Sequence, residues 1–153
     1  MRTVEIRPLA SADAVACDAI IAGLPDWFGN EHGIRDCAEA VRSQPGLVAV
    51  EGGIVRGFLT WERREATGAE ITWMAVRSDD RRRGVGHAML SALLDRLRAD
   101  SIDRLDVKTL SEREPYAPYA ETRAFYVANG FVKVAELDIW GPENPAVLLS
   151  RSL

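Results

Sequence analysis

The sequence contains few cysteines and no surplus of positive charge, and both shortages exclude classes of protein. Cys17 and Cys37 are the only cysteines among 153 residues, with no CxxC spacing and no histidine cluster beside them. They cannot form a disulfide framework or a zinc site by themselves, so we expect buried thiols in a reducing compartment and no metal. Lysine and arginine number 19 against 23 aspartates and glutamates, which gives a formal net charge of -4. Nucleic-acid and membrane-surface binders normally carry excess positive charge, so we expect neither kind of partner.

Long apolar runs are also missing. Arg2, Glu5 and Arg7 interrupt the start of the chain, which argues against a signal peptide, and no segment approaches the length that spans a bilayer. The chain is nevertheless 47% hydrophobic, which is enough to form a folded core. We therefore expect a soluble, cytoplasmic protein that folds as a single domain over residues 1–153.

Alternating hydrophobicity and turn residues predict the order of the strands and helices. Val15, Ala19 and Ile20 are expected to share the buried face of the first helix. Hairpin-connected strands followed by alternating strands and helices indicate an α/β fold of the α+β kind, a mixed sheet with helices on both faces. Strands are expected over 3–7, 47–51, 54–61, 69–76, 105–110, 131–140 and 146–150, and helices over 12–23, 33–43, 120–129 and a long segment that opens at Gly84.

The turn between the strand 69–76 and the long helix has the composition of an anion-binding site. It reads Arg81-Arg82-Arg83-Gly84-Val85-Gly86. Glycines leave backbone N–H groups uncovered, the start of a helix adds unpaired donors, and arginines add positive charge, so a phosphate or pyrophosphate is the expected ligand. A dinucleotide fingerprint would need glycine where Met89 stands, and a nucleotide triphosphatase loop would need Lys-Ser/Thr where His87-Ala88 follow.

This turn resembles the acetyl-CoA-binding motif of the GNAT superfamily of N-acetyltransferases, as Arg81-x-x-Gly84-x-Gly86. The segment Thr122–Phe131 is similar to that family's second signature, a short helix that ends in Phe-Tyr-x-x-x-Gly-Phe. The resemblance implies a mostly antiparallel sheet of about seven strands. It also implies that acetyl-CoA is the co-substrate and that the acetyl group passes to a primary amine.

The resemblance further implies which residues hold acetyl-CoA. The strand before the turn would splay from the next parallel strand and open a cleft for the pantetheine arm. Met74 N–H would polarise the thioester carbonyl and Val76 would pair with the pantetheine amides, with Ala75 between them. Tyr119 stands where many members carry an asparagine that contacts the arm. The pyrophosphate would be held by the turn residues Arg81, Arg82, Arg83, Gly84, Val85, Gly86, His87 and Ala88.

Two side chains match catalytic positions of the family. Glu70 stands where some members carry a general base, and Tyr126 matches the usual general acid, which protonates the departing thiolate. Alternation places Glu70, Thr72 and Met74 on one face of the strand, unless a bulge intervenes. Simpler interpretations stay open, since Glu70 could merely end an edge strand and Tyr126 could be a packed aromatic.

The acceptor side is less defined. Trp27 and Phe28 lie in the connection between the first two helices and either line an acceptor pocket or close the core. Four acidic residues would favour a cationic amine if they faced the cleft: Asp26, Glu31, Glu62 and Asp138.

Three further expectations concern the reaction and the assembly. Neither cysteine lies in a motif for an acyl-cysteine route, so direct attack on a small-molecule amine is the leading hypothesis. A non-catalytic acyl-CoA-binding or regulatory module is the alternative. Dimerisation through the last strands is expected only by analogy with such folds.

Overall fold

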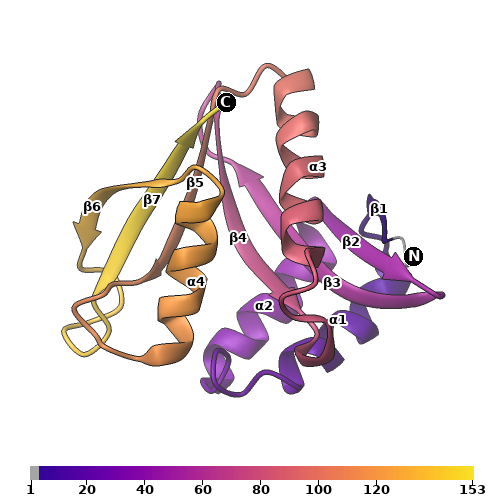
Figure 1. Cartoon of the computed structure of the whole chain (residues 1–153), viewed down its shortest axis with the longest axis horizontal. Coiled ribbons are helices and arrows are strands. Elements are labelled where there is room, and N and C mark those ends of the chain that lie inside the picture. Colours follow the sequence, from indigo (N-terminus) through magenta and orange to yellow (C-terminus); the bar gives the residue numbers. More distant parts are fainter. Residues whose placement is uncertain (1–3) are drawn as a thin grey trace.

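The computed structural model describes residues 4–153, which form one seven-stranded sheet with helices on both faces (Figure 1). The sheet order is β1-β2-β3-β4-β5-β7-β6, and every neighbouring pair is antiparallel except β4 and β5. The strands are β1 (Glu5–Pro8), β2 (Gly46–Glu51), β3 (Ile54–Arg63), β4 (Gly68–Val76), β5 (Arg104–Leu110), β6 (Val132–Leu137) and β7 (Ala146–Ser152). The helices are α1 (Ala14–Ala22), α2 (Glu31–Ser43), α3 (Val85–Ala99) and α4 (Ala117–Ala128), with short 3-10 turns at Ser11–Asp13 and Ser78–Asp80.

The predicted fold class and element order are confirmed, and the boundaries differ by a few residues. The helix α4 begins three residues earlier than expected because Pro118 fits the first turn of a helix, where its missing N–H needs no partner. The first predicted strand is observed from Glu5 onward, and Thr3 lies outside the described residues. Within residues 4–153, no helix combines the length and apolar character needed to cross a membrane.

The prediction that Val15 and Ala19 are buried was wrong, whereas Ile20 is buried as expected. Val15 is 75% exposed, and α1 instead buries Ala14, Cys17, Ile20 and Ile21. This helix is apolar on nearly all sides, so periodicity alone does not select the face that meets the sheet.

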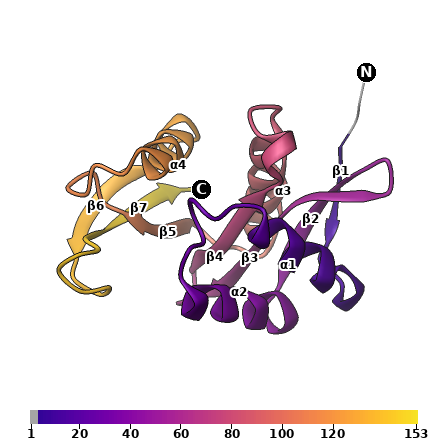
Figure 2. The same cartoon turned by 90° about the horizontal axis from the view of Figure 1, so that it is seen from below.

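The sheet separates two apolar cores (Figure 2). On one face, α3 buries Met89, Leu90 and Leu93 against the central strands, together with Tyr126 from α4. On the other face, α1 and α2 cover Phe58 of β3, which is fully buried. Strands β3 and β4 are packed between these two cores, so they form a rigid support for the side chains and backbone groups that β4 directs outward.

The parallel pair at the centre of the sheet is short. Residues Gly68–Ile71 of β4 pair with Arg104–Val107 of β5, after which the two strands no longer pair with each other, although β4 stays paired with β3 and β5 with β7. Figure 1 shows β4 and β5 diverging from this point, with α3 packed beside β4 and α4 beside β5. The predicted splay of the strand 70–76 from its parallel neighbour is therefore confirmed.

Removing a buried ring should test the core under α1 and α2. We expect Phe58→Ala to lower the free energy of unfolding by about 3–5 kcal/mol, because the site is enclosed on both sides and cannot collapse around the smaller side chain. Val15→Ala is the matched control and should change stability by less than about 0.5 kcal/mol, since Val15 is exposed. Urea denaturation of both variants measures the difference, and equal losses would contradict the assigned faces of α1.

Candidate functional site

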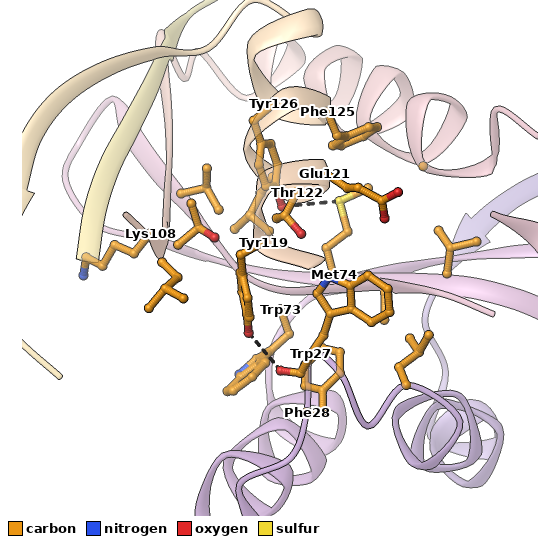
Figure 3. Close-up of a pocket in the computed structure, with 18 of the residues that line it drawn as sticks. Trp27, Phe28, Trp73, Met74, Lys108, Tyr119, Glu121, Thr122, Phe125 and Tyr126 are labelled. Atoms are coloured by element: carbon orange, nitrogen blue, oxygen red, sulfur yellow. Dashed lines mark hydrogen bonds between the residues drawn. The ribbon is translucent and has the colours of Figure 1, made fainter. Parts of the chain in front are cut away.

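A cleft of about 1620 Å³ opens where β4 and β5 diverge. Its walls come from β4, the β5 end, the first turn of α3, the inner face of α4 and the α1–α2 connection. Figure 3 looks into this cleft, with Tyr126 and Phe125 on one side and Trp73 and Phe28 on the other. Most of the predicted site residues are brought together here, although they are spread over a hundred residues of sequence.

The backbone of β4 offers donors to the cleft at two positions. Arg77 N–H donates to Arg56 O at 2.8 Å, so these residues form a hydrogen-bonded pair of the β3–β4 ladder. Such pairs alternate with pairs whose polar groups point outward, which turns the N–H groups of Met74 and Val76 away from β3 and toward the cleft. Ala75 occupies the intervening hydrogen-bonded position, so its backbone faces β3 although the residue lines the cleft.

A bulge in β4 breaks the alternation that placed Glu70, Thr72 and Met74 on one face. Trp61 pairs with Ile71 and Thr60 with Trp73, which leaves Thr72 without a partner in the ladder. Ile71 and Met74 consequently both pack on the α3 side, while Trp73 packs with the α1–α2 core.

The bulge thus corrects one prediction about the site. Glu70 and Met74 project from opposite faces of β4, yet both line the cleft because the cleft passes through the splay.

The turn before α3 has the predicted anion-binding geometry. Gly84 has φ +82°, a conformation that glycine adopts without strain, and it precedes the first turn of the helix. The N–H groups of Val85, Gly86 and His87 belong to this first turn, where a helix supplies no acceptors. Ala88 N–H instead donates to Gly84 O at 3.0 Å, and Ala88 does not line the cleft.

Gly86 also allows two helices to approach each other. A Cβ atom built on Gly86 would lie 3.2 Å from the ring of Phe125 and 3.5 Å from the terminal methyl of Met74. The glycine therefore lets α4 pack against the start of α3, in addition to leaving the backbone accessible.

The three arginines of the turn have different partners. Arg83 does not line the cleft; it pairs with the buried Asp80 at 2.6 Å and with Glu51 at 3.7 Å. Arg81 and Arg82 both pair with Glu121 of α4, and their guanidinium groups hold the pKa of that carboxyl below its ordinary value. Only Arg81 and Arg82 line the cleft, so they are the arginines placed to meet an anion there.

Tyr126 is almost fully enclosed but directs its hydroxyl into the cleft. The residue is 5% exposed and packs edge-on against Phe125 and Phe131. Its hydroxyl donates to the thioether sulfur of Met74 at 3.7 Å, the contact drawn in Figure 3. Burial raises the pKa of the Tyr126 phenol, so the group remains protonated at neutral pH.

Glu70 is paired with two cations at the narrow end of the splay. Its side chain is 12% exposed, and Oε1 lies 3.2 Å from Lys108 Nζ and 3.4 Å from Arg64 Nε. Lys108 is the first residue of β5 after the paired segment. The sequence shows that Lys108 stands between Val107 and Thr109, which are buried. Its contact with Glu70 can be recognised only once the register between β4 and β5 is known.

The α1–α2 connection is tied to the start of α4 by three hydrogen bonds. Trp27 Nε1 donates to Pro118 O at 3.0 Å, Tyr119 Oη donates to Trp27 O at 2.8 Å, and Tyr116 Oη donates to Asp26 O at 2.8 Å. Burial raises the pKa of Tyr119, which keeps this hydroxyl a donor. We call the residues 26–28 and 116–119 the aromatic strap. Trp27 and Phe28 both line the cleft.

The four acidic residues that the sequence suggested for the acceptor side do not line the cleft. None of Asp26, Glu31, Glu62 and Asp138 lines it. Apart from Glu121 and Asp80, which pair with arginines of the anion-binding turn, the lining carboxylates are Glu70, Asp36, Glu114 and Glu143. Their contribution depends on how distant loops fold together, which the sequence does not display.

Both cysteines lie outside the cleft. Cys17 and Cys37 are buried in the α1–α2 layer, where desolvation raises each thiol pKa to about 12. Thiols in this state are poor nucleophiles at neutral pH.

Known structures share this architecture. A GNAT-family protein from Desulfovibrio desulfuricans superposes with a TM-score of 0.87 at 18% identity, over 98% of this chain and 99% of that chain. The ribosomal-protein-alanine N-acetyltransferase of Brucella melitensis gives 0.74 at 20% identity, over 97% and 99%. The protein yncA from Salmonella typhimurium, solved with its cofactor acetyl-CoA, gives 0.73 at 17%, over 99% and 94%. At these identities the likeness shows a shared fold.

Comparison of sequences gives two results. No curated protein sequence matches this one significantly. The family model described as an acetyltransferase (GNAT) domain matches residues 43–133, which include the anion-binding turn, Glu70 and Tyr126. Because this match covers more than half of the sequence, the chain belongs to the GNAT family of acetyltransferases.

Proposed function

We propose that the protein is an enzyme that transfers the acetyl group of acetyl-CoA to the primary amine of a small-molecule acceptor by direct attack. The observation that carries this proposal is the composition of one cleft. The anion-binding turn, the outward N–H groups of β4, Glu70 and Tyr126 all line it. Anion capture, carbonyl polarisation and proton transfer are thereby available in a single continuous space.

The pyrophosphate of acetyl-CoA would bind at the first turn of α3. The N–H groups of Val85, Gly86 and His87 and the positive end of the helix dipole favour an anion there. Arg81 and Arg82 would exchange their shared partner Glu121 for the phosphates. The fold neighbour yncA, which holds acetyl-CoA, supports the choice of this co-substrate.

The arm of acetyl-CoA would then run along β4. Val76 N–H is oriented to bond a pantetheine amide, and Met74 N–H to bond the thioester carbonyl. When an amine attacks that carbonyl carbon, negative charge develops on its oxygen. One well-placed donor to such an oxygen stabilises the transition state by roughly 2.7–4 kcal/mol.

Glu70 would act on the amine through water. A cationic amine must lose a proton before its nitrogen can attack, and a carboxylate can accept that proton. Met74 lies four positions after Glu70 in β4, which corresponds to at most roughly 13 Å because the bulge at Thr72 shortens the strand, and this is still more than a glutamate side chain spans. We therefore propose that the proton passes from the attacking nitrogen to Glu70 through bridging water rather than directly.

Tyr126 would stabilise the sulfur that leaves. A phenol is ordinarily a weaker acid than a thiol, and burial raises the pKa of Tyr126 further. Full proton transfer to the thiolate is thus uphill, so the main contribution of Tyr126 is a hydrogen bond to the departing sulfur. Its present bond to the Met74 sulfur shows that the hydroxyl can reach a sulfur atom in this cleft.

The acceptor is proposed to be cationic. Asp36 of α2, Glu114 of the β5–α4 connection and Glu143 of the β6–β7 connection line the cleft. Together with Glu70 they outnumber Lys108, the one lysine or arginine among the described lining residues outside the anion-binding turn. The buried cysteines outside the cleft support direct attack over an acetyl-cysteine intermediate.

A thiol-release assay across amines tests the proposed function. We expect acetyl-CoA to bind in calorimetry and free CoA thiol to appear with at least one of four groups: polyamines, aminoglycosides, amino acids or peptides with free N-termini. Binding without turnover on any amine would favour the non-catalytic acyl-CoA-binding module. Absence of binding would overturn the proposal, and a preference for anionic acceptors would contradict the proposed charge selection.

Tyr126→Phe tests the role of the hydroxyl at the departing sulfur. We expect kcat to fall about 10²-fold, as when one transition-state donor is removed, with little change in acetyl-CoA affinity. Because the raised pKa keeps Tyr126 protonated through neutral and mildly alkaline pH, wild type and variant should show the same alkaline side of the pH–rate profile. An unchanged kcat would remove Tyr126 from the reaction.

Glu70→Gln tests the base. We expect kcat/KM to fall by about 10²-fold or more and the decline of rate on the acidic side of the pH profile to disappear, since glutamine accepts no proton. Glu62→Gln is the control, because Glu62 pairs with Glu70 across the β3–β4 ladder and shares Arg64 but does not line the cleft. Equal effects of the two substitutions would assign Glu70 a structural role only.

A further inference from the structure

The aromatic strap joins the two halves of the protein that the splay separates. On the β4 side, the ring of Phe28 lies 6.1 Å from that of Trp73. On the β5 side, Arg123 of α4 donates to Leu110 O at 2.7 Å, at the end of the strand. The bonds of Trp27 to Pro118 and Tyr119 connect these two sides, so the strap crosses the opening beyond the last pair of β4 and β5.

The strap is also connected to the anion-binding turn. The Arg81 guanidinium carbon lies 4.2 Å from the centre of the Trp27 ring, within the range of a cation–π contact. The same guanidinium is 3.2 Å from Glu121. Trp27 therefore contacts, in one place, an arginine of the turn and the start of α4.

The position of the strap along α4 relates it to the reacting end of the arm. Tyr119 precedes Tyr126 by two helical turns, roughly 10 Å along the axis, and both side chains face the cleft. A linear group that runs from the first turn of α3 along β4 would share this cleft with Tyr119 and Trp27, which both line it. Figure 3 draws Trp27, Tyr119 and Met74 among the residues that line the cleft, with a dashed line for the hydrogen bond from Tyr119 to Trp27.

We propose that Trp27 is an acetyl-CoA-binding residue rather than an acceptor-binding one, and that the aromatic strap closes over the pantetheine arm within the splay. This inference rests on the proposed function, because it takes the anion-binding turn as the pyrophosphate site. Trp27 supplies an apolar wall for the arm and keeps Arg81 beside the phosphates. The arm leaves only when the bonds between the α1–α2 connection and α4 open.

Dissociation of acetyl-CoA from the full chain provides the test. In stopped-flow displacement we expect Trp27→Ala to raise koff about tenfold, because the wall and the strap bonds are lost together. Tyr119→Phe keeps the ring and removes only the bond to Trp27 O, so koff should rise about threefold. Adenosine 3′-phosphate 5′-diphosphate, which lacks the arm, should dissociate from Trp27→Ala and wild type at rates within about twofold.

The matched control is Trp140→Ala. Trp140 is another tryptophan that lines the cleft, but it lies in the β6–β7 connection outside the strap, so its removal should leave the koff of acetyl-CoA unchanged. The KM of the best acceptor from the amine panel should be the same in Trp27→Ala and wild type.

The outcomes separate this inference from the proposed function. Wild-type protein that does not bind acetyl-CoA overturns both. Wild type that binds, together with Trp27→Ala that keeps the wild-type koff and raises the acceptor KM, overturns the inference and leaves the proposed function standing. Because Tyr119→Phe preserves the ring packing, an unchanged koff in this variant would also count against the strap even if Trp27→Ala failed to fold.

Discussion

The pairing of β4 with β5 ends after Ile71 and Val107, and the rest of the site depends on this limit. Two parallel strands that stayed hydrogen-bonded to their ends would consume the outward N–H groups of Met74 and Val76 and would leave no space between them. Separation of the strands leaves these donors at the wall of a cleft, with one strand fixed between two cores. The cost of unpaired backbone groups is acceptable only where a ligand or water satisfies them, which makes the splay the natural place for a ligand.

The helices that flank the splay define its two ends. The start of α3 contributes the anion-binding turn, and α4 contributes Tyr126 and Tyr119 from one face. Gly86 links these contributions, because its missing side chain lets Phe125 approach the first turn of α3. Gly86 thus leaves the backbone N–H groups of the turn accessible and also allows α4 to pack closely. The close packing of α4 sets the position of Tyr126 relative to the turn.

The sequence predicted those parts of the molecule whose chemistry is local. The positions in the fold of the turn Arg81–Gly86, of the short helix with Tyr126 and of the splay were predicted correctly, because each lies in one short segment or follows from a motif. The bulge at Thr72 was not predictable, since it appears only when the β3–β4 register shifts between Thr60 and Trp61.

Long-range contacts were the other gap. Glu121 pairs with Arg81 and Arg82, and Glu70 pairs with Lys108. The partners in each pair lie far apart in the chain, so the sequence pattern alone does not indicate these contacts. Composition suggested that acidic residues would face an acceptor, but the individual residues proposed were wrong because loop packing selects which ones reach the cleft.

The bulge at Thr72 reverses which alternate residues of β4 face a given side of the sheet, so the two halves of the strand follow opposite patterns. One continuous strand can therefore present the Glu70 carboxylate on one face of the sheet and Met74, the proposed contact for acetyl-CoA, on the other. Substitutions in β4 must be interpreted with a different odd–even rule on each side of Thr72.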